Sequence, residues 1–160
     1  MEVADRVVLI TGASSGVGAA LATQLGLMGA RVVVNYSRSA EAAEAVVEQI
    51  TGAGGQALAV QADVSEEADC KRLVATTVEH FGQLDVLVNN AGTTTFVPHD
   101  QLDALTEDIW LRTLRVNLIG AFIMSREAAP HIEAAGGGDC LLYTSPSPRD
   151  TNPSRMPSSA

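Results

Sequence analysis

Four short, mostly apolar runs are spaced along the first 90 residues of the chain. They cover residues 6–11, 31–35, 56–61 and 84–88. Runs of this kind are typical of strands that are buried on both faces of a parallel sheet. The pattern therefore predicts four strands, each separated from the next by a longer segment.

The segments between these runs have the composition and spacing of helices. The first, residues 16–28, stops at Gly29, and the second, residues 39–50, is rich in alanine and glutamate, which favour helices. A third helix is predicted after Ser65, which we expect to cap its first turn. The predicted buried face of this helix consists of Leu73, Val74, Thr77, Val78 and Phe81.

A long helix is predicted after the fourth strand. It begins near Thr106 and ends before the glycines at 136–138. Its apolar residues fall on two sides, so we expect two packing partners, one of which is the sheet. One side consists of Leu111, Leu114, Leu118 and Phe122, and the other of Val116, Ile119 and Ile123.

Strands that alternate with helices of this length indicate an α/β fold with a doubly wound parallel sheet and right-handed crossovers. A chain of 160 residues is long enough for one such domain. The predicted sheet stops after about four strands and the long helix. We therefore expect residues 1–139 to form one truncated domain.

The composition changes after Asp139. Residues 140–160 contain four of the six prolines and five serines, and no helix or strand pattern continues there. One interpretation is a disordered tail, which this composition favours. A second hypothesis is a non-native tail, because Cys-Leu-Leu-Tyr-Thr-Ser-Pro-Ser-Pro-Arg-Asp at 140–150 resembles the translation of a transposase adapter used to prepare sequencing libraries. On that hypothesis the tail has no functional meaning, and the native gene sequence past codon 139 would differ from it.

The formal net charge of −9 and the single lysine argue against nucleic acid as a partner, because a phosphate backbone requires clustered cations. No apolar run approaches the roughly 20 residues of a membrane helix, and the first residues lack the pattern of a secretory signal. We therefore expect a cytoplasmic protein with no membrane span. Cys70 and Cys140 have no metal-ligand spacing, so no metal site is predicted, and Cys70 is interpreted as a small helix residue.

Residues 11–18, Thr-Gly-Ala-Ser-Ser-Gly-Val-Gly, lie between the first predicted strand and the first predicted helix. This is the position of the phosphate-binding turn in dinucleotide-binding Rossmann folds. Gly12 would permit the tight turn, Gly16 the close approach of a diphosphate, and Gly18 the close packing of the helix. Glycines also serve turns that bind nothing, but their place after a buried strand favours phosphate binding. A nucleotide triphosphatase loop is excluded, because alanines stand where it requires Lys and Ser or Thr.

Four motifs, in this order and spacing, resemble the classical short-chain dehydrogenase/reductase family. They are Thr-Gly-x-x-x-Gly-x-Gly at 11–18, Asp63-Val64, Asn-Asn-Ala-Gly at 89–92, and Val-Asn-Leu-x-Gly at 116–120. The resemblance covers residues 6 to about 138 and is nearest to the branch of 3-oxoacyl-carrier-protein reductases and glucose dehydrogenases. It implies a Rossmann-type fold and hydride transfer between a nicotinamide cofactor and a carbonyl or alcohol substrate.

The resemblance also implies roles for individual residues. Asp63 and Val64 would border the adenine, residues 90–92 would line the cofactor beyond the fourth strand, and Asn117 would be the catalytic asparagine that holds a relay water. An amide among apolar neighbours is costly unless it is hydrogen-bonded, which supports a functional role for Asn117. The predicted cofactor-binding residues are Gly12, Ser14, Ser15, Gly16, Val17, Gly18, Ser37, Arg38, Asp63, Val64, Asn90, Ala91 and Gly92.

The end of the second strand bears on the choice of cofactor. An acidic residue there would bind the ribose hydroxyls of NAD, but the chain has Asn35, Tyr36, Ser37 and Arg38. Arg38 could form charge-assisted hydrogen bonds with the 2′-phosphate of NADP. The sequence therefore favours NADP. NAD stays an alternative, because Ser15 stands where NADP-using relatives often have a basic residue.

In the family, a tyrosine transfers the proton and a lysine four residues later lowers its pKa, but the chain contains no Tyr-x-x-x-Lys. We therefore expect the chain itself to be inactive, as a truncated copy of an NADP-dependent oxidoreductase. The alternative is a non-catalytic nucleotide-binding module. The resemblance further implies that the parent is a homodimer or homotetramer, in which the second side of the long helix contacts a neighbouring subunit.

Overall fold

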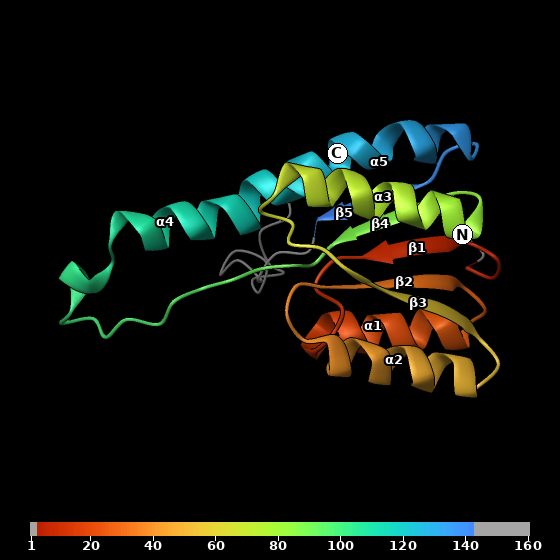
Figure 1. Ribbon diagram of the computed structural model, residues 1–160, viewed down its shortest axis with the longest axis horizontal. Helices are drawn as coiled ribbons and strands as arrows, with labels where there is room; N and C mark the ends of the chain where they lie inside the picture. The colour runs from red at the N-terminus through yellow and green to blue at the C-terminus, as the bar shows by residue number, and fades with distance from the viewer. Residues whose placement is uncertain (1–2, 143–160) are drawn as a thin grey trace, which may run out of the picture.

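Five parallel strands form the central sheet of the computed structural model, which describes residues 3–142 (Figure 1). Their order across the sheet is β3-β2-β1-β4-β5. The strands are β1 (Val7–Ile10), β2 (Arg31–Tyr36), β3 (Gln56–Gln61), β4 (Val86–Asn89) and β5 (Asp139–Leu142). The helices are α1 (Gly16–Leu27), α2 (Ala40–Gly52), α3 (Glu67–Phe81), α4 (Glu107–Leu114) and α5 (Ala121–Ala134), with a 3-10 turn η1 (Leu102–Ala104) and a π-helical turn η2 (Arg115–Gly120).

Helices cover both faces of the sheet. Helices α1 and α2 pack on one face, and α3 and α5 pack on the other (Figure 1). The chain builds the sheet outward from β1 to β3, returns to the middle, and then builds outward from β4 to β5. A ligand crevice is expected at this reversal, beyond the carboxyl ends of β1 and β4. The arrangement confirms the doubly wound α/β fold predicted from the sequence.

The core lies on both sides of β1 and β2. Every residue of β1 is buried, and so are residues 32–34 of β2. Successive side chains point to opposite faces, so Leu9 packs in the cluster under α3 and α5, and Ile10 in the cluster under α1 and α2. Burial on both faces explains why these strands are continuous apolar runs rather than alternating ones.

Helix α3 presents the predicted apolar face to the core, but the predicted cap is wrong. Glu66 rather than Ser65 is the N-cap residue, and it makes no side-chain cap bond. The Ser65 hydroxyl donates instead to Asp63 Oδ1 at 2.7 Å, and the Ser65 N–H donates to the same oxygen at 3.0 Å. Because the hydroxyl is turned to this carboxylate, in a turn typical of aspartate, it makes no bond to the first turn of α3.

The structure extends the sheet beyond the prediction. Residues 139–142 form β5, which pairs with β4 and places Cys140 opposite Leu87. The doubly wound fold is confirmed, and its sheet has five strands where about four were predicted. Residues 140–142, which the prediction places in a disordered tail, lie in β5 instead. The segment is rich in proline and serine, so its composition does not indicate a strand. The backbone of residues 140–142 nevertheless pairs with the open edge of β4. The rest of the predicted tail, residues 143–160, lies outside the described residues.

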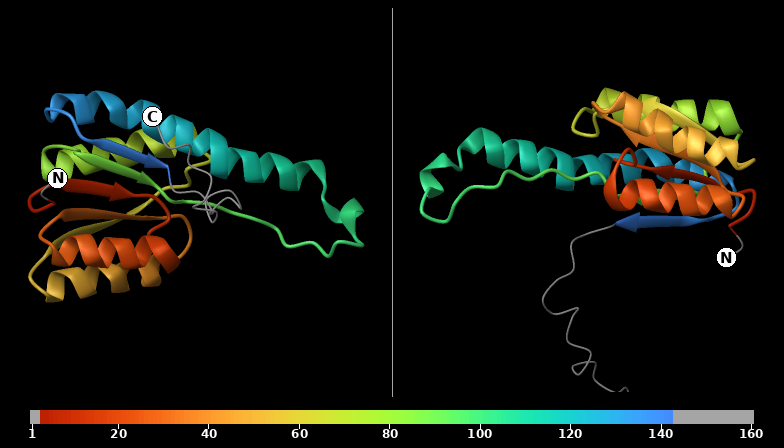
Figure 2. Two further views of the ribbon diagram at one scale, coloured as in Figure 1. Left: turned by 180° about the vertical axis from the view of Figure 1, so that it is seen from behind. Right: turned by 90° about the horizontal axis from the view of Figure 1, so that it is seen from below.

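The predicted long helix is present but not uniform. Helix α4, the turn η2 and helix α5 follow one another without a break. Helix α4 projects from the body of the domain (Figure 1 and Figure 2) and has no buried residue. On one of the two predicted apolar sides, Val116 and Ile123 are buried, whereas Ile119 is 45% exposed. The other side is exposed and has no partner within residues 3–142; it consists of Leu111, Leu114, Leu118 and Phe122.

Helix α3 buries Cys70 completely, and burial raises the pKa of its thiol to about 11. Cys70 is therefore an inert packing residue, as the sequence predicts. None of the helices between residues 3 and 142 is long and apolar enough to cross a membrane.

Candidate functional site

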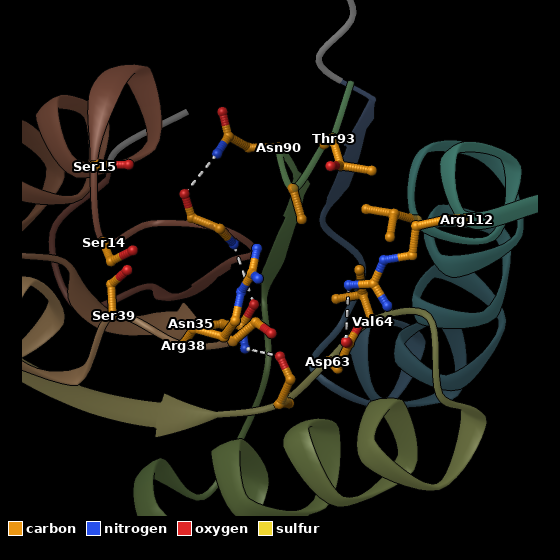
Figure 3. A pocket seen from close by; sticks show the side chains of 16 residues that line it. Ser14, Ser15, Asn35, Arg38, Ser39, Asp63, Val64, Asn90, Thr93 and Arg112 are labelled. Carbon is orange, nitrogen blue, oxygen red and sulfur yellow. Dashed lines mark hydrogen bonds and ion pairs between the residues drawn. The ribbon is translucent and has the colours of Figure 1, made fainter. Parts of the chain in front are cut away.

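A cleft of about 400 Å³ opens where the strand order reverses (Figure 3). Its walls come from the β1–α1 turn, the ends of β2 and β3, the segment after β4, and the α4–η2 stretch. Most of the predicted site residues line it, namely Gly12, Ser14, Ser15, Ser37, Arg38, Asp63, Val64, Asn90, Ala91 and Gly92. Gly16, Val17 and Gly18 lie farther along in the first turn of α1, and Asn117 lies on η2 outside the lining.

The glycines of the β1–α1 turn have different tasks. Gly12 has a φ of +63°, and a Cβ there would lie 2.8 Å from Ala91 Cα. A Cβ on Gly18 would lie 2.7 Å from the carbonyl oxygen of Gly12. Gly16 has a φ of +57°, but a Cβ there would meet no atom within 4 Å. Gly12 and Gly18 therefore permit close packing, whereas Gly16 leaves open space at the start of α1.

Thr11 and Asn90 fasten the turn to the segment after β4. Thr11 Oγ1 accepts hydrogen bonds from the N–H groups of Asn90 and Ala91, both at 3.0 Å. Asn90 Nδ2 donates to the carbonyl oxygens of Thr11 at 2.9 Å and Gly12 at 3.0 Å. Sequence reasoning places Asn90 beside a cofactor but does not single out Thr11. The available signal was a hydroxyl at the end of an otherwise apolar strand.

Asn35, at the end of β2, holds the same turn from the other side. The residue is 1% exposed, and its Oδ1 accepts a hydrogen bond from the Gly12 N–H at 3.1 Å. Its Nδ2 donates to the carbonyl oxygens of Val60 at 3.2 Å and Ala62 at 3.1 Å. The sequence motifs do not point to Asn35 as a site residue. The signal was an amide in a run of valines, where burial is costly unless every polar atom has a partner.

The first turn of α1 has free hydrogen-bond donors beside the cleft. Among the described residues, the backbone N–H groups of residues 14–18 have no hydrogen-bond acceptor. Ser15 is the N-cap residue and makes no side-chain cap bond, and the first turn contains no acidic side chain. Free N–H groups and the positive end of the helix dipole attract an anion such as a diphosphate.

Asp63 and Arg112 form the wall of the cleft opposite Ser14 (Figure 3). Asp63 Oδ2 accepts a hydrogen bond from Arg112 Nη2 at 3.2 Å. Burial alone would raise the pKa of Asp63, but hydrogen bonds from Ser65 and the positive charge of Arg112 hold that pKa below its ordinary value. The carboxylate is therefore ionised, and accepts hydrogen bonds only, at neutral pH. Arg112 gives no local signal in the sequence, because a charged residue on an exposed helix is ordinary.

Asn117 binds the loop after β4 rather than the cleft itself. Its Oδ1 accepts a hydrogen bond from the Thr93 N–H at 2.7 Å, and its Nδ2 donates to the Thr93 carbonyl oxygen at 2.9 Å. The cost of burying an amide does not apply to Asn117, because the residue is exposed and its neighbours Leu118 and Ile119 also face outward. The amide oxygen and nitrogen are nevertheless both hydrogen-bonded, and they hold the backbone of a residue that lines the cleft.

A doubly wound parallel sheet with a glycine turn and a cleft at its switch point defines a Rossmann-type dinucleotide-binding protein. The chain belongs to the short chain dehydrogenase family, whose model matches residues 6–160. This match confirms the resemblance that the four sequence motifs indicate.

The similar proteins are about twice as long as this chain. Versicolorin reductase 1 of Aspergillus parasiticus is 47% identical over 140 residues, which are 88% of this chain and 52% of that protein. The structure of a short-chain dehydrogenase/reductase from Serratia marcescens is 40% identical, with a TM-score of 0.76, over 82% of this chain and 53% of that one. A short chain dehydrogenase from Burkholderia cenocepacia, solved in complex with NADP, is 39% identical, with a TM-score of 0.77, over 82% and 53% of the two chains. The chain thus spans about half the length of the curated relatives it matches.

Proposed function

We propose that the parent of this chain is an NADP-dependent oxidoreductase that transfers a hydride between the nicotinamide and a small carbonyl or alcohol substrate. The described residues would form its cofactor site. The observation that carries the proposal is the cleft where the β1–α1 turn, with its free N–H groups, meets the segment after β4. The NADP bound to the relative from Burkholderia cenocepacia and the name of versicolorin reductase support the reaction class.

The residues around the cleft fit a dinucleotide. The N–H groups at the start of α1 would bind the diphosphate, Asp63 and Val64 would border the adenine, and residues 90–92 would line the cofactor beyond β4. When bound, the cofactor supplies or accepts the hydride. Asn117 would correspond to the family's catalytic asparagine. Its amide also binds the backbone of Thr93 at the wall of the cleft.

We propose that this chain binds the cofactor without turning it over, because its 160 residues contain no Tyr-x-x-x-Lys. The same observation supports a second candidate, a nucleotide-binding module with no catalytic task. The native gene sequence past codon 139 separates the two. A Tyr-x-x-x-Lys motif downstream would identify a truncated oxidoreductase, and a native end without one would identify a binding module.

Arg38 is proposed to select NADP, since it lines the cleft at the end of β2, which carries no carboxylate. The variant Arg38→Gln should weaken NADPH binding by about 10- to 100-fold, because hydrogen bonds to a charged group contribute about 1.5–3 kcal/mol. Binding of NADH should stay unchanged. Isothermal titration calorimetry of the 160-residue chain with both dinucleotides measures the two affinities.

Arg115→Gln is the matched control, because Arg115 is exposed and does not line the cleft. Equal loss of NADPH and NADH affinity in Arg38→Gln would contradict a role in cofactor choice. A folded wild-type chain that binds neither dinucleotide would contradict the proposed function as a whole. The wild-type chain should also oxidise NADPH no faster than background when carbonyl compounds are added.

We further propose that the parent assembles as a homodimer or homotetramer through the exposed side of α4, η2 and α5. Leu118 and Phe122 on this side are 63% and 62% exposed. In a two-fold symmetric dimer, the apolar side of one copy packs against the same apolar side of the other copy. Leu118→Glu should convert the oligomer to a monomer, because a carboxylate in the interface is costly to desolvate. Analytical ultracentrifugation measures the change.

The control for this variant is Leu27→Glu, which makes the same substitution at a 59% exposed leucine on α1. This control should keep the wild-type sedimentation. A full-length parent that sediments as a monomer would refute the proposed assembly.

A further inference from the structure

Arg112 is the polar link between α4 and the body of the domain. Helix α4 has no buried residue and packs mainly on η2, which continues it. From this projecting helix, Arg112 Nη2 reaches Asp63 Oδ2 at 3.2 Å, and Nη1 reaches Ser65 Oγ at 3.4 Å. Within residues 3–142, no other side chain of α4 forms a hydrogen bond to the body. The guanidinium thus spans two residues of the segment that follows β3.

The carboxylate of Asp63 has one acceptor position left. A carboxylate offers about four lone-pair positions. Oδ1 accepts two hydrogen bonds from Ser65, one from its N–H and one from its hydroxyl, and Oδ2 accepts one from Arg112. The remaining position belongs to Oδ2, on a residue that lines the cleft.

Arg112 is the hydrogen-bond partner of Oδ2. Both bonds from Ser65 end on Oδ1, and they come from a neighbouring residue of the same segment. The bond from Arg112 is the one that holds the second oxygen in place. Figure 3 shows Arg112 reaching Asp63 from the α4 side of the cleft, whereas Arg38 enters from the end of β2. The two arginines therefore act on different parts of the cleft.

We propose that Arg112 is a positioning residue for the base of the cofactor. It holds Asp63 Oδ2 so that this oxygen accepts a hydrogen bond from the 6-amino group of adenine. The inference rests on the proposed function, in which Asp63 borders the adenine. A base with a carbonyl oxygen at that position would face the fixed carboxylate and be rejected, because two acceptors would then oppose each other.

The test compares NADPH with reduced nicotinamide hypoxanthine dinucleotide phosphate, which has a carbonyl oxygen in place of the 6-amino group. We expect the wild-type chain to prefer NADPH by about tenfold or more, and Arg112→Gln to reduce this preference to less than about threefold. Arg112→Lys should have a base preference between those of the wild type and Arg112→Gln. Its ammonium group keeps the positive charge but cannot donate to Asp63 and Ser65 with the geometry of a guanidinium. Arg115→Gln, with the same loss of charge on the adjacent turn, should keep the wild-type preference.

The outcomes separate this inference from the proposed function. An unchanged base preference in Arg112→Gln overturns the inference. Equal weakening of NADPH and its hypoxanthine analogue also overturns it, because this result indicates a general structural role. Loss of NADPH affinity with no loss of NADH affinity also overturns it, because Arg112 would then contact the 2′-phosphate. A wild-type chain that is folded by circular dichroism but binds neither dinucleotide refutes the proposed function itself.

Discussion

Replacing Gly12 with alanine should strongly weaken cofactor binding and destabilise the domain. The new Cβ would lie 2.8 Å from Ala91 Cα, so the β1–α1 turn must open to make room. Alanine in the left-handed conformation costs about 1–2 kcal/mol, and overpacking about 1–3 kcal/mol more. We expect the free energy of unfolding to fall by about 2–5 kcal/mol, measured by urea denaturation. The dissociation constant of NADPH should rise by about 100-fold or more, measured by calorimetry, because the N–H groups that bind the diphosphate would be displaced.

The matched control is Gly54→Ala, in the turn between α2 and β3. Gly54 also has a positive φ, +87°, but a Cβ there would meet no atom within 4 Å, and the residue does not line the cleft. The control should lose about 1–2 kcal/mol of stability and bind NADPH as the wild type does. If the two variants proved equally stable and bound NADPH equally well, the close approach of Gly12 to Ala91 would have no energetic importance.

Thr11→Val should destabilise the domain by about 2–4 kcal/mol, although valine has nearly the shape of threonine. Thr11 is 1% exposed, and its hydroxyl oxygen is the acceptor for the N–H groups of Asn90 and Ala91. Valine would leave both donors without this partner, and an unsatisfied buried donor costs about 1–3 kcal/mol. The segment after β4 should also shift, so NADPH binding should weaken together with the urea midpoint.

Thr11→Ser separates the hydroxyl from the methyl group. Serine keeps the acceptor and removes one methyl, so we expect a loss of about 1 kcal/mol and nearly unchanged NADPH affinity. Should serine destabilise the domain as much as valine does, the methyl packing and not the hydroxyl would be the important feature of Thr11.

Much of the fold was predictable because buried strands leave a local signal. The apolar run at 31–35 corresponds to β2, and the segment predicted at 16–28 corresponds to α1 within one residue. Strand β5 left no such signal. It has four residues, all exposed, and it exists because β4 offers an open edge to pair with.

The main parts of the candidate site were also predictable, because parallel strands bring their carboxyl ends to one edge of the sheet. The glycine turn and the Asn-Asn-Ala-Gly segment follow β1 and β4, which pair directly. Asn35 and Arg112 were missed for opposite reasons. Asn35 is a polar residue hidden in an apolar run, and Arg112 is a charged residue on an exposed helix, where charge is ordinary.

By itself the sequence determined the doubly wound sheet, the short chain dehydrogenase family and the segments that meet at the cleft. These follow from the order of apolar runs and motifs along the chain. Only the tertiary structure decided that Thr11 and Asn90 fasten two strand ends together, that Arg112 pairs with Asp63, and that residues 139–142 join the sheet. The partners in these contacts lie dozens of residues apart, and their geometry depends on how helices pack on a twisted sheet, which no local pattern of residues contains.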